Sequence, residues 1–298
     1  MAFKNDFRPD VIAGNPPYNN GMDIDFVFSA FDIAKVAVSM ITPAKWQTAE
    51  ADQRIDSTHS YGDFREKIVP YIDKVVFYPD AAEIFEIRNV DGISIYTLTH
   101  ELVDKCHIIN RCLHQKHFNS EAYRDIKQRQ SLHNIGEEIV KSLGSIESFK
   151  FKNITHNKKY EVWTGNQVNG GCGWGYADRQ NPCSLVNLDG AFKCIGSSVI
   201  VDTEIGEADS RGASTCVFES DNKEECQSFV SWLDTKLVRF LVASNIGKLT
   251  GILTDDYFRF VPIPFKGFNE IYTDKEMYKH YNISEKHIEI IESIILPR

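Results

Sequence analysis

Short apolar runs and longer mixed segments alternate along the first hundred residues. The apolar runs at 10–13, 36–41, 75–78 and 93–98 have the length and composition of buried strands. Between them, residues 25–35 and 61–71 carry apolar side chains at the spacing of one helix face. Strands separated by helices predict an α/β fold, with a largely parallel sheet covered by helices.

The character of the chain changes twice after this region. Residues 105–148 are rich in His, Gln, Lys and Glu and predict a polar helical connector. From residue 149 onwards, Gly, Asn, Thr and Ser separate short strands, predicted at 160–163 and 198–202. One long helix is predicted at 223–242 and a final helix at 284–295. We therefore expect three segments, an α/β unit at 1–104, the connector at 105–148 and an α+β unit at 149–298.

Composition limits the function classes without selecting one. The 298 residues carry a net charge of −9, contain no run of about 18 apolar residues and begin without the apolar core of a signal peptide. We expect a cytoplasmic protein without membrane contact. The seven cysteines, none spaced as C-x-x-C, predict reduced thiols, and no metal site is expected. The acidic balance does not exclude a nucleic-acid partner, because phosphate binding depends on a local basic face.

The four residues Asn15-Pro16-Pro17-Tyr18 follow the first predicted strand directly. Two adjacent prolines fix two φ angles and push the preceding residues out of the helical region, so the strand ends in a stiff, extended turn. In α/β folds, ligands bind at the carboxyl ends of the strands. The same residues also fit a plain Pro-Pro turn with an Asn cap and a packed Tyr, and the pattern alone leaves both readings open.

A stiff turn with these groups suits one chemical task. The exocyclic amine of adenine is a poor nucleophile because its lone pair is conjugated with the ring. The amide oxygen of Asn15 and the carbonyl of Pro16 can accept its two hydrogens, which directs the lone pair at an electrophile. Acceptors fixed in advance stabilise the transition state without reorganising. The ring of Tyr18 is suited to stack on a base turned out of the duplex.

The string Asp10-Val-Ile-Ala-Gly-Asn-Pro-Pro-Tyr18 resembles the catalytic motif of the N6-adenine DNA methyltransferases of restriction–modification systems. Further blocks are similar to that family's in the same order: 39–46 to its next strand and loop, 73–78 with Ile84-Phe85 to the following strand, and 90–96 to its edge strand. The tail at 256–264 and 270–281 resembles the end of the family's target-recognition region.

The resemblance implies a partial Rossmann-like methyltransferase sheet in 1–104 and a target-recognition domain in 149–298. It implies methyl transfer from S-adenosylmethionine to adenine N6, with Asn15, Pro16, Pro17 and Tyr18 as the catalytic motif. Asn15 and Pro43 would also contact the donor.

Double-stranded DNA is the implied partner. Lysines in the second unit would contact phosphates, and Asn, Gln and Arg side chains would read bases. The expected DNA-binding residues are Lys150, Lys152, Lys158, Lys159, Asn166, Gln167, Trp174, Arg179, Lys193 and Arg211.

One part of the family's pattern has no match in this sequence. The donor is normally held by a Gly-rich turn after the family's first strand. The Gly-rich stretch at 170–175 has no helix signal after it, and residues 204–207, which follow a predicted strand, have one glycine and two carboxylates. The donor site is therefore expected to be incomplete in this chain, and an N-terminal half or second subunit to complete it. Two alternatives stay open. The chain is a DNA-binding specificity module without catalytic duty, or part of a combined restriction–modification enzyme.

Overall fold

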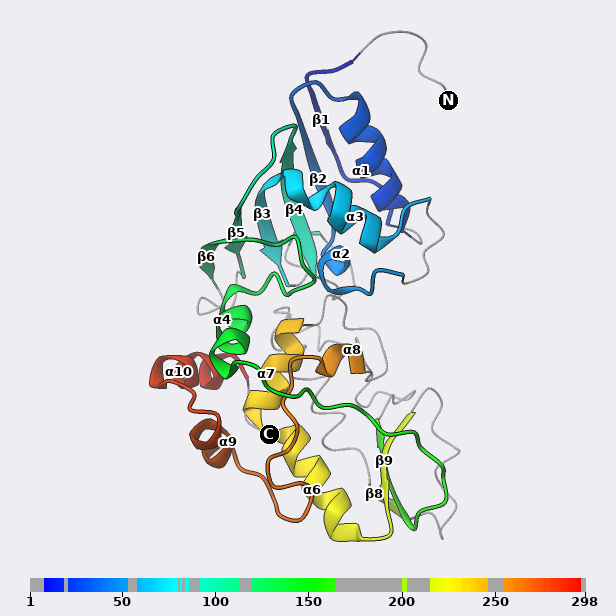
Figure 1. Cartoon of the computed structure of the whole chain (residues 1–298), viewed down its shortest axis with the longest axis vertical. Coiled ribbons are helices and arrows are strands. Elements are labelled where there is room, and N and C mark those ends of the chain that lie inside the picture. Colours follow the sequence, from blue (N-terminus) through cyan, green and yellow to red (C-terminus); the bar gives the residue numbers. More distant parts are fainter. Residues whose placement is uncertain are drawn as a thin grey trace.

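Six strands form one mixed sheet in the first half of the chain (Figure 1). The structure is a computed structural model that describes residues 8–18, 21–52, 58–79, 81, 84–85, 92–112, 119–164, 200–202, 215–245 and 255–295. The strands are β1 (Val11–Gly14), β2 (Ala37–Pro43), β3 (Ile72–Tyr78), β4 (Ile93–Thr99), β5 (Cys106–Asn110) and β6 (Ser120–Arg124). Their order in the sheet is β1-β2-β4-β3-β5-β6.

The expectation of a largely parallel sheet is wrong. Only β1–β2 and β3–β5 pair in parallel, whereas β4 runs antiparallel to both of its neighbours, β2 and β3, and β6 runs antiparallel to β5. The strand predicted at the sheet edge, β4, lies inside the sheet. Each of its residues is at least partly buried, as befits a strand with a partner on both sides.

Helices α1 (Met22–Ile33), α2 (Lys45–Thr48) and α3 (Tyr61–Lys67) pack beside this sheet, and a 3₁₀ turn (Val69–Tyr71) leads into β3. Ser60 and Asp63 form a capping box that begins α3. The rings of Trp46, Phe64 and Tyr96 meet beneath these helices, with Trp46 and Phe64 5.4 Å apart between ring centroids. Their contact links α2, α3 and β4 in one core.

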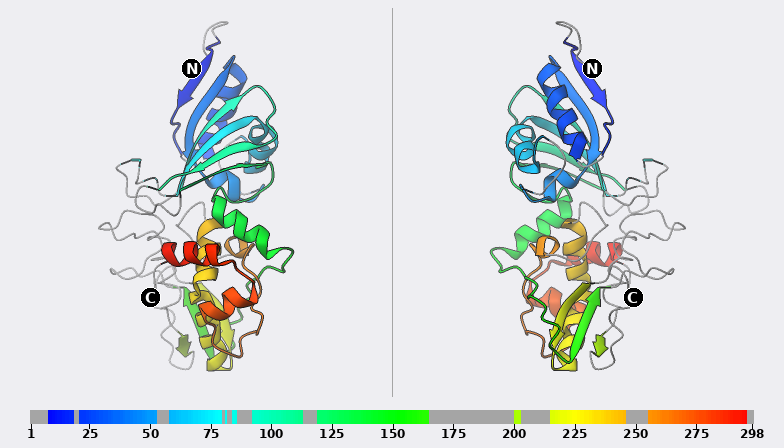
Figure 2. Two further views of the ribbon diagram at one scale, coloured as in Figure 1. Left: turned by 90° about the vertical axis from the view of Figure 1, so that its left-hand side faces the viewer. Right: turned by 90° about the vertical axis from the view of Figure 1, so that its right-hand side faces the viewer.

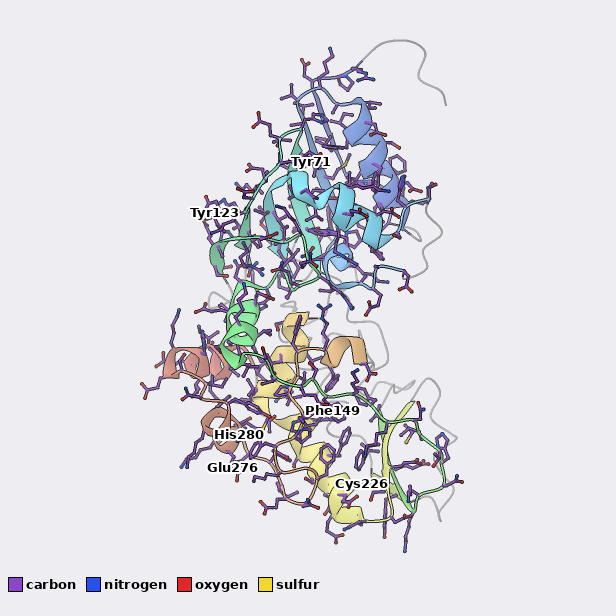
Figure 3. All side chains as sticks on the ribbon, in the orientation of Figure 1. Tyr71, Tyr123, Phe149, Cys226, Glu276 and His280 are labelled. Atoms are coloured by element: carbon purple, nitrogen blue, oxygen red, sulfur yellow. The ribbon has the colours of Figure 1, made fainter. Side chains whose placement is uncertain are left out.

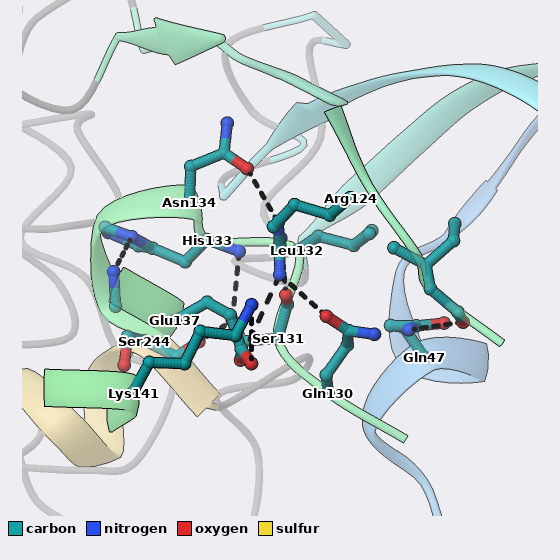
Figure 4. A network of polar contacts seen from close by, with 12 residues as sticks. Gln47, Arg124, Gln130, Ser131, Leu132, His133, Asn134, Glu137, Lys141 and Ser244 are labelled. Carbon is teal, nitrogen blue, oxygen red and sulfur yellow. Dashed lines mark hydrogen bonds and ion pairs between the residues drawn. The ribbon is translucent and has the colours of Figure 1, made fainter. Parts of the chain in front are cut away.

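The prediction of a helical connector at 105–148 is wrong over most of that segment. Strands β5 and β6 occupy 106–124 and extend the sheet, and the described helix in this segment is α4 (Asn134–Leu143). Buried Arg124 at the end of β6 explains how a polar sequence joins a sheet. Its guanidinium donates to Asn134 (3.1 Å), Gln130 (2.8 Å) and the Ser131 carbonyl (2.8 Å) (Figure 4). The polar residues satisfy one another inside the fold rather than facing solvent on a helix.

The second half contains a small antiparallel sheet in the order β8-β7-β9 and a group of helices (Figures 1 and 2). The strands are β7 (Tyr160–Thr164), β8 (Ile200–Asp202) and β9 (Thr215–Ser220). The helices are α6 (Lys223–Asp234), α7 (Lys236–Asn245), α8 (Asp255–Phe258), α9 (Asp274–His280) and α10 (Glu285–Ile294). Phe149, which Figure 3 labels, packs at the centre of this half against Phe229, Trp232 and Phe258.

The single long helix predicted at 223–242 is instead two helices, α6 and α7. Thr235 between them has an extended ψ of 139°, and the backbone N–H of Lys236 donates to the Asp274 carboxylate at 2.5 Å. A tertiary partner therefore takes a donor that a continuous helix would have used. Among the described helices, none combines the length and apolar character that crossing a bilayer requires.

Candidate active site

The turn 15–18 lies at the carboxyl edge of the six-stranded sheet. Gly14, the last residue of β1, pairs with Met40 in the parallel strand β2, so the turn begins beside the last residues of β2. Pro43 ends β2 and is half-buried opposite Ile93, the first residue of β4. The structure thus brings the predicted residues Asn15 and Pro43 to the same edge of the sheet.

Within the turn, the two predicted acceptor residues differ in exposure. Asn15 and Pro17 are exposed, Tyr18 is half-buried and Pro16 is buried. The Tyr18 hydroxyl donates a short hydrogen bond to the amide oxygen of Asn15. This bond fixes the orientation of the Asn15 carboxamide and leaves its oxygen one further lone pair. Of the two predicted acceptor residues, Asn15 is therefore the one open to solvent.

A buried carboxyl group, Asp23, adjoins the turn in the first turn of α1. It is 4% exposed, and burial raises its pKa to about 6, against the opposing effect of the backbone N–H groups of Asp23 and Ile24. The charge of Asp25 raises this pKa further, and that of Lys45 lowers it. Asp23 therefore exchanges a proton around pH 6, about two pH units above an ordinary aspartate.

Three tyrosine hydroxyls lie near this carboxyl group. Burial raises the pKa of Tyr18 to about 12, and the negative charge of Asp23 raises it further, while the bond to Asn15 lowers it. Burial also raises the pKa values of Tyr61 and Tyr96, again with a contribution from Asp23. All three tyrosines are therefore neutral donors at physiological pH.

A chain of hydrogen bonds between β2, α2 and β4 reaches Tyr96 of this cluster. The Trp46 indole N–H donates to the Ser94 hydroxyl at 2.9 Å, and the Thr42 hydroxyl lies 3.4 Å from the hydroxyls of Ser94 and Tyr96. Arg65 donates to the Trp46 carbonyl at 2.5 Å. Thr42, Ser94 and Trp46 are fully buried. Because the buried polar groups hold one another, the edge next to Asn15 is rigid.

Sequence reasoning found the turn but missed Asp23, Tyr61 and Tyr96. Asp23 gave a weak signal, because acidic residues are favoured in the first turn of any helix. The two tyrosines come from α3 and β4, and only the folded sheet brings them near the turn.

The predicted DNA contacts divide into two groups. Lys150, Lys152, Lys158 and Lys159 are all exposed, which agrees with a role on phosphates. Lys158 pairs with Asp221 at 2.6 Å, and Lys159 lies 5.5 Å from the ring centre of Tyr160. Lys150 and Lys152 flank Phe151, whose ring turns inward against Phe149 and Phe258. The remaining predicted contacts lie outside the described residues: Asn166, Gln167, Trp174, Arg179, Lys193 and Arg211.

Asn15 and Pro43, the residues predicted to contact a donor, lie at the same edge of the sheet, and the buried Asp23 lies near Tyr18 of the turn. The Gly-rich stretch at 170–175 and the segment 204–207 lie outside the described residues. Neither the scan against protein-family models nor the search of the curated proteins gave a match, so the family resemblance rests on the motif residues themselves.

Proposed function

We propose that the turn 15–18 is the acceptor site of an adenine-specific DNA methyltransferase of the restriction–modification type. The reaction is methyl transfer from S-adenosylmethionine to N6 of an adenine turned out of duplex DNA. Residues 149–298 would contain the region that recognises the target sequence. The observation that carries the proposal is the exposed Asn15 carboxamide, held by Tyr18 on a two-proline turn at the carboxyl edge of the sheet.

This geometry supports the chemistry through fixed acceptors. The oriented Asn15 oxygen accepts one N6 hydrogen, and this draws the nitrogen lone pair out of conjugation with the ring. The Pro16 carbonyl would accept the second hydrogen once an entering base displaces what covers that residue. Bound S-adenosylmethionine supplies an electrophilic methyl group. As the new N6–C bond forms, the S–C bond of the donor would break and S-adenosylhomocysteine would leave. N6 would pass one proton to solvent water, so the product amine is neutral.

The arrangement of strands also supports a methyltransferase sheet. The turn begins where β1 ends, opposite Met40 near the end of β2, and this carboxyl edge is where open α/β sheets bind ligands. The antiparallel strand β4 between β2 and β3 begins at the same edge, because Ile93 pairs with both Pro43 and Tyr78. One edge therefore collects Asn15, Pro43 and the buried Asp23, as a site for a base and a donor requires.

The proposal predicts that Asn15→Ala loses methyl transfer while DNA binding is retained. The chain, with its donor-binding partner polypeptide added, would be assayed for transfer of labelled methyl groups to adenine in DNA. Loss of a fixed polar group that acts on the transition state costs about 10²–10³ in rate. Asn269→Ala is the control, because Asn269 is an exposed asparagine on the second unit. DNA affinity is measured for all three proteins.

An Asn15→Ala protein that methylates at the wild-type rate would overturn the assigned role. The alternative is a DNA-binding specificity module. It would be favoured if the wild-type chain binds one DNA sequence specifically but forms no methylated adenine with any donor-binding partner polypeptide. The exposed lysines at 150 and 152 support that second candidate, because they need no catalytic turn. Product formation decides between the two.

A further inference from the structure

Three potential metal ligands from separate parts of the chain converge on the small sheet of the second unit. The ligand atoms of His156, Glu161 and Cys216 all lie within 4.8 Å of one another. His156 precedes β7, Glu161 lies on β7, and Cys216 lies on the neighbouring strand β9. We infer that these three residues bind a divalent cation of the zinc class, a site that is independent of the function proposed above.

An irregularity in the sheet brings the cysteine to the glutamate. Glu161 pairs with Glu219 and Val162 with Phe218, but the register then shifts, so that Trp163 pairs with Cys216 instead of Val217. Side chains alternate between the faces of a strand, so the extra residue returns Cys216 to the face that carries Glu161. Bulges often aim side chains in this way at functional sites.

Both strand ligands are buried on the side of the sheet away from the apolar core. Val162 and Phe218 point to the other face, where the Phe218 ring stacks on Phe229 of α6 with centroids 4.5 Å apart. Glu161 is 2% exposed and Cys216 is 6% exposed. Burying a carboxylate beside a thiol is costly, and a bound cation offsets that cost for both groups.

The histidine is held in place by its backbone. His156 has a left-handed φ of 57°, which is uncommon for a residue with a side chain. The Glu219 carboxylate accepts from the backbone N–H groups of Thr155 (2.8 Å) and His156 (2.8 Å) and so fixes this turn. The His156 Nδ1 then lies 2.8 Å from the Glu161 carboxylate. The structure thus maintains an unfavourable backbone conformation that directs the imidazole at Glu161.

The donor set indicates which cation fits. One thiolate, one imidazole and one carboxylate are ligands that zinc accepts, and their two negative charges match a divalent ion. Around a tetrahedral zinc, with bonds of about 2.0–2.3 Å, ligand atoms lie about 3.2–3.8 Å apart. To reach this range, His156 Nδ1 and the Glu161 carboxylate, now 2.8 Å apart, must separate slightly, and ligand atoms that lie up to 4.8 Å apart must move closer. The His156 side chain is 57% exposed, which leaves a path for the ion and room for a water as fourth ligand.

Cobalt titration of the chelator-treated 298-residue chain tests the site. Co²⁺ bound by a thiolate gives a charge-transfer band in the near ultraviolet and strong visible bands when tetrahedral. We expect one Co²⁺ per chain, displaced by one Zn²⁺. In Cys216→Ser the charge-transfer band should be absent. His156→Ala alters an exposed side chain, should fold normally, and should weaken binding by at least the roughly 10–100-fold known for supporting groups of metal sites.

Cys226→Ser is the matched control. Cys226 is another fully buried cysteine of the same unit, on α6 (Figure 3), and its replacement should leave the cobalt spectrum unchanged. The inference is overturned if the wild-type chain gives no thiolate charge-transfer band, or if that band persists in Cys216→Ser. If wild type and His156→Ala bind cobalt with equal affinity, His156 is not a ligand and the proposed three-ligand site is wrong.

Discussion

At the scale of single residues, the turn after β1 combines an exposed amide with a buried acid. Asn15 depends on local sequence, because two prolines and a tyrosine three positions away set its orientation. Asp23 depends on the fold, because its raised pKa comes chiefly from burial under the sheet edge. The two kinds of residue call for different tests.

For Asp23 the test is the pH dependence of stability. Burial raises its pKa from an ordinary 3.8 to about 6, so between these values the folded state keeps a proton that the unfolded state loses. The free energy of unfolding contributed by this residue therefore falls as pH rises through that window. At pH 7 we expect Asp23→Asn to be more stable than wild type by about 1–3 kcal/mol, and to match it below pH 4.

Urea unfolding at several pH values measures this difference. Asp25→Asn is the control, because Asp25 lies on the same helix with the opposite shift. Burial alone would raise its pKa, but hydrogen bonds from Thr58 and His59 outweigh burial and lower it. Asp25→Asn should therefore lose stability at pH 7. A constant difference between Asp23→Asn and wild type from pH 4 to 7 would show that Asp23 titrates normally.

The same distinction explains how much of the candidate site the sequence could predict. The Asn15–Tyr18 turn was predictable because neighbouring residues determine its shape. Tyr61 and Tyr96 were not predictable, because only the fold brings them near Asp23. The metal ligands His156, Glu161 and Cys216 were missed for the same reason, since a register shift between two strands brings them together.

At the scale of elements, the errors arose where tertiary partners override composition. Strands β1 to β4 were predicted close to their observed positions, since apolar runs mark buried strands. Strand β6 was predicted as helix, because its residues Ser120–Arg124 are polar and form a half-exposed strand at the sheet edge. Its pairing with β5 and the buried hydrogen bonds of Arg124 join that strand to the core.

Helix packing in the second half gives a test at this scale. Gly136 in α4 faces α7 so closely that an added Cβ would overlap the Cβ of Ser244 and lie 2.6 Å from its Oγ. Glycine to alanine inside an exposed helix normally stabilises by about 1 kcal/mol. Here we expect Gly136→Ala to destabilise by about 1–3 kcal/mol, measured by urea unfolding.

A second substitution separates packing from helix propensity. Ser244→Gly removes the side chain that the new methyl group would meet, so the double variant Gly136→Ala/Ser244→Gly should recover stability relative to the sum of the two single changes. Additive losses in this double-mutant cycle would mean that α4 and α7 do not pack as described.

At the scale of the whole molecule, the two halves share a continuous set of contacts. Gln47 after β2 donates to the carbonyls of Ile126 and Gln128, each at 3.1 Å. Ser131 binds the Ser244 carbonyl of α7, and Arg259 donates to the Arg129 carbonyl at 2.8 Å. These bonds tie the sheet edge that carries Asn15 to the unit that carries the exposed lysines. Under the proposed function, a duplex bound by the second unit would therefore take a fixed position relative to the turn.

The charge of the whole chain makes this arrangement testable. With a net charge of −9, the protein as a whole repels DNA, so under the proposed function binding would depend on local lysines. Each phosphate contact contributes about 0.9 to the slope of log affinity against log salt concentration. We expect Lys150→Ala/Lys152→Ala to lower that slope by about 2, because both side chains project from one exposed segment on either side of Phe151.

Lys158→Ala is the internal comparison, since Asp221 already neutralises its charge at 2.6 Å and DNA must compete with that carboxylate. Its effect on the slope should be less than half that of the double variant. Binding measured by fluorescence anisotropy across a range of salt concentrations gives all three slopes. If the double variant keeps the wild-type slope, the DNA phosphates do not contact Lys150 and Lys152. The duplex would then reach Asn15 across a different surface of the second unit.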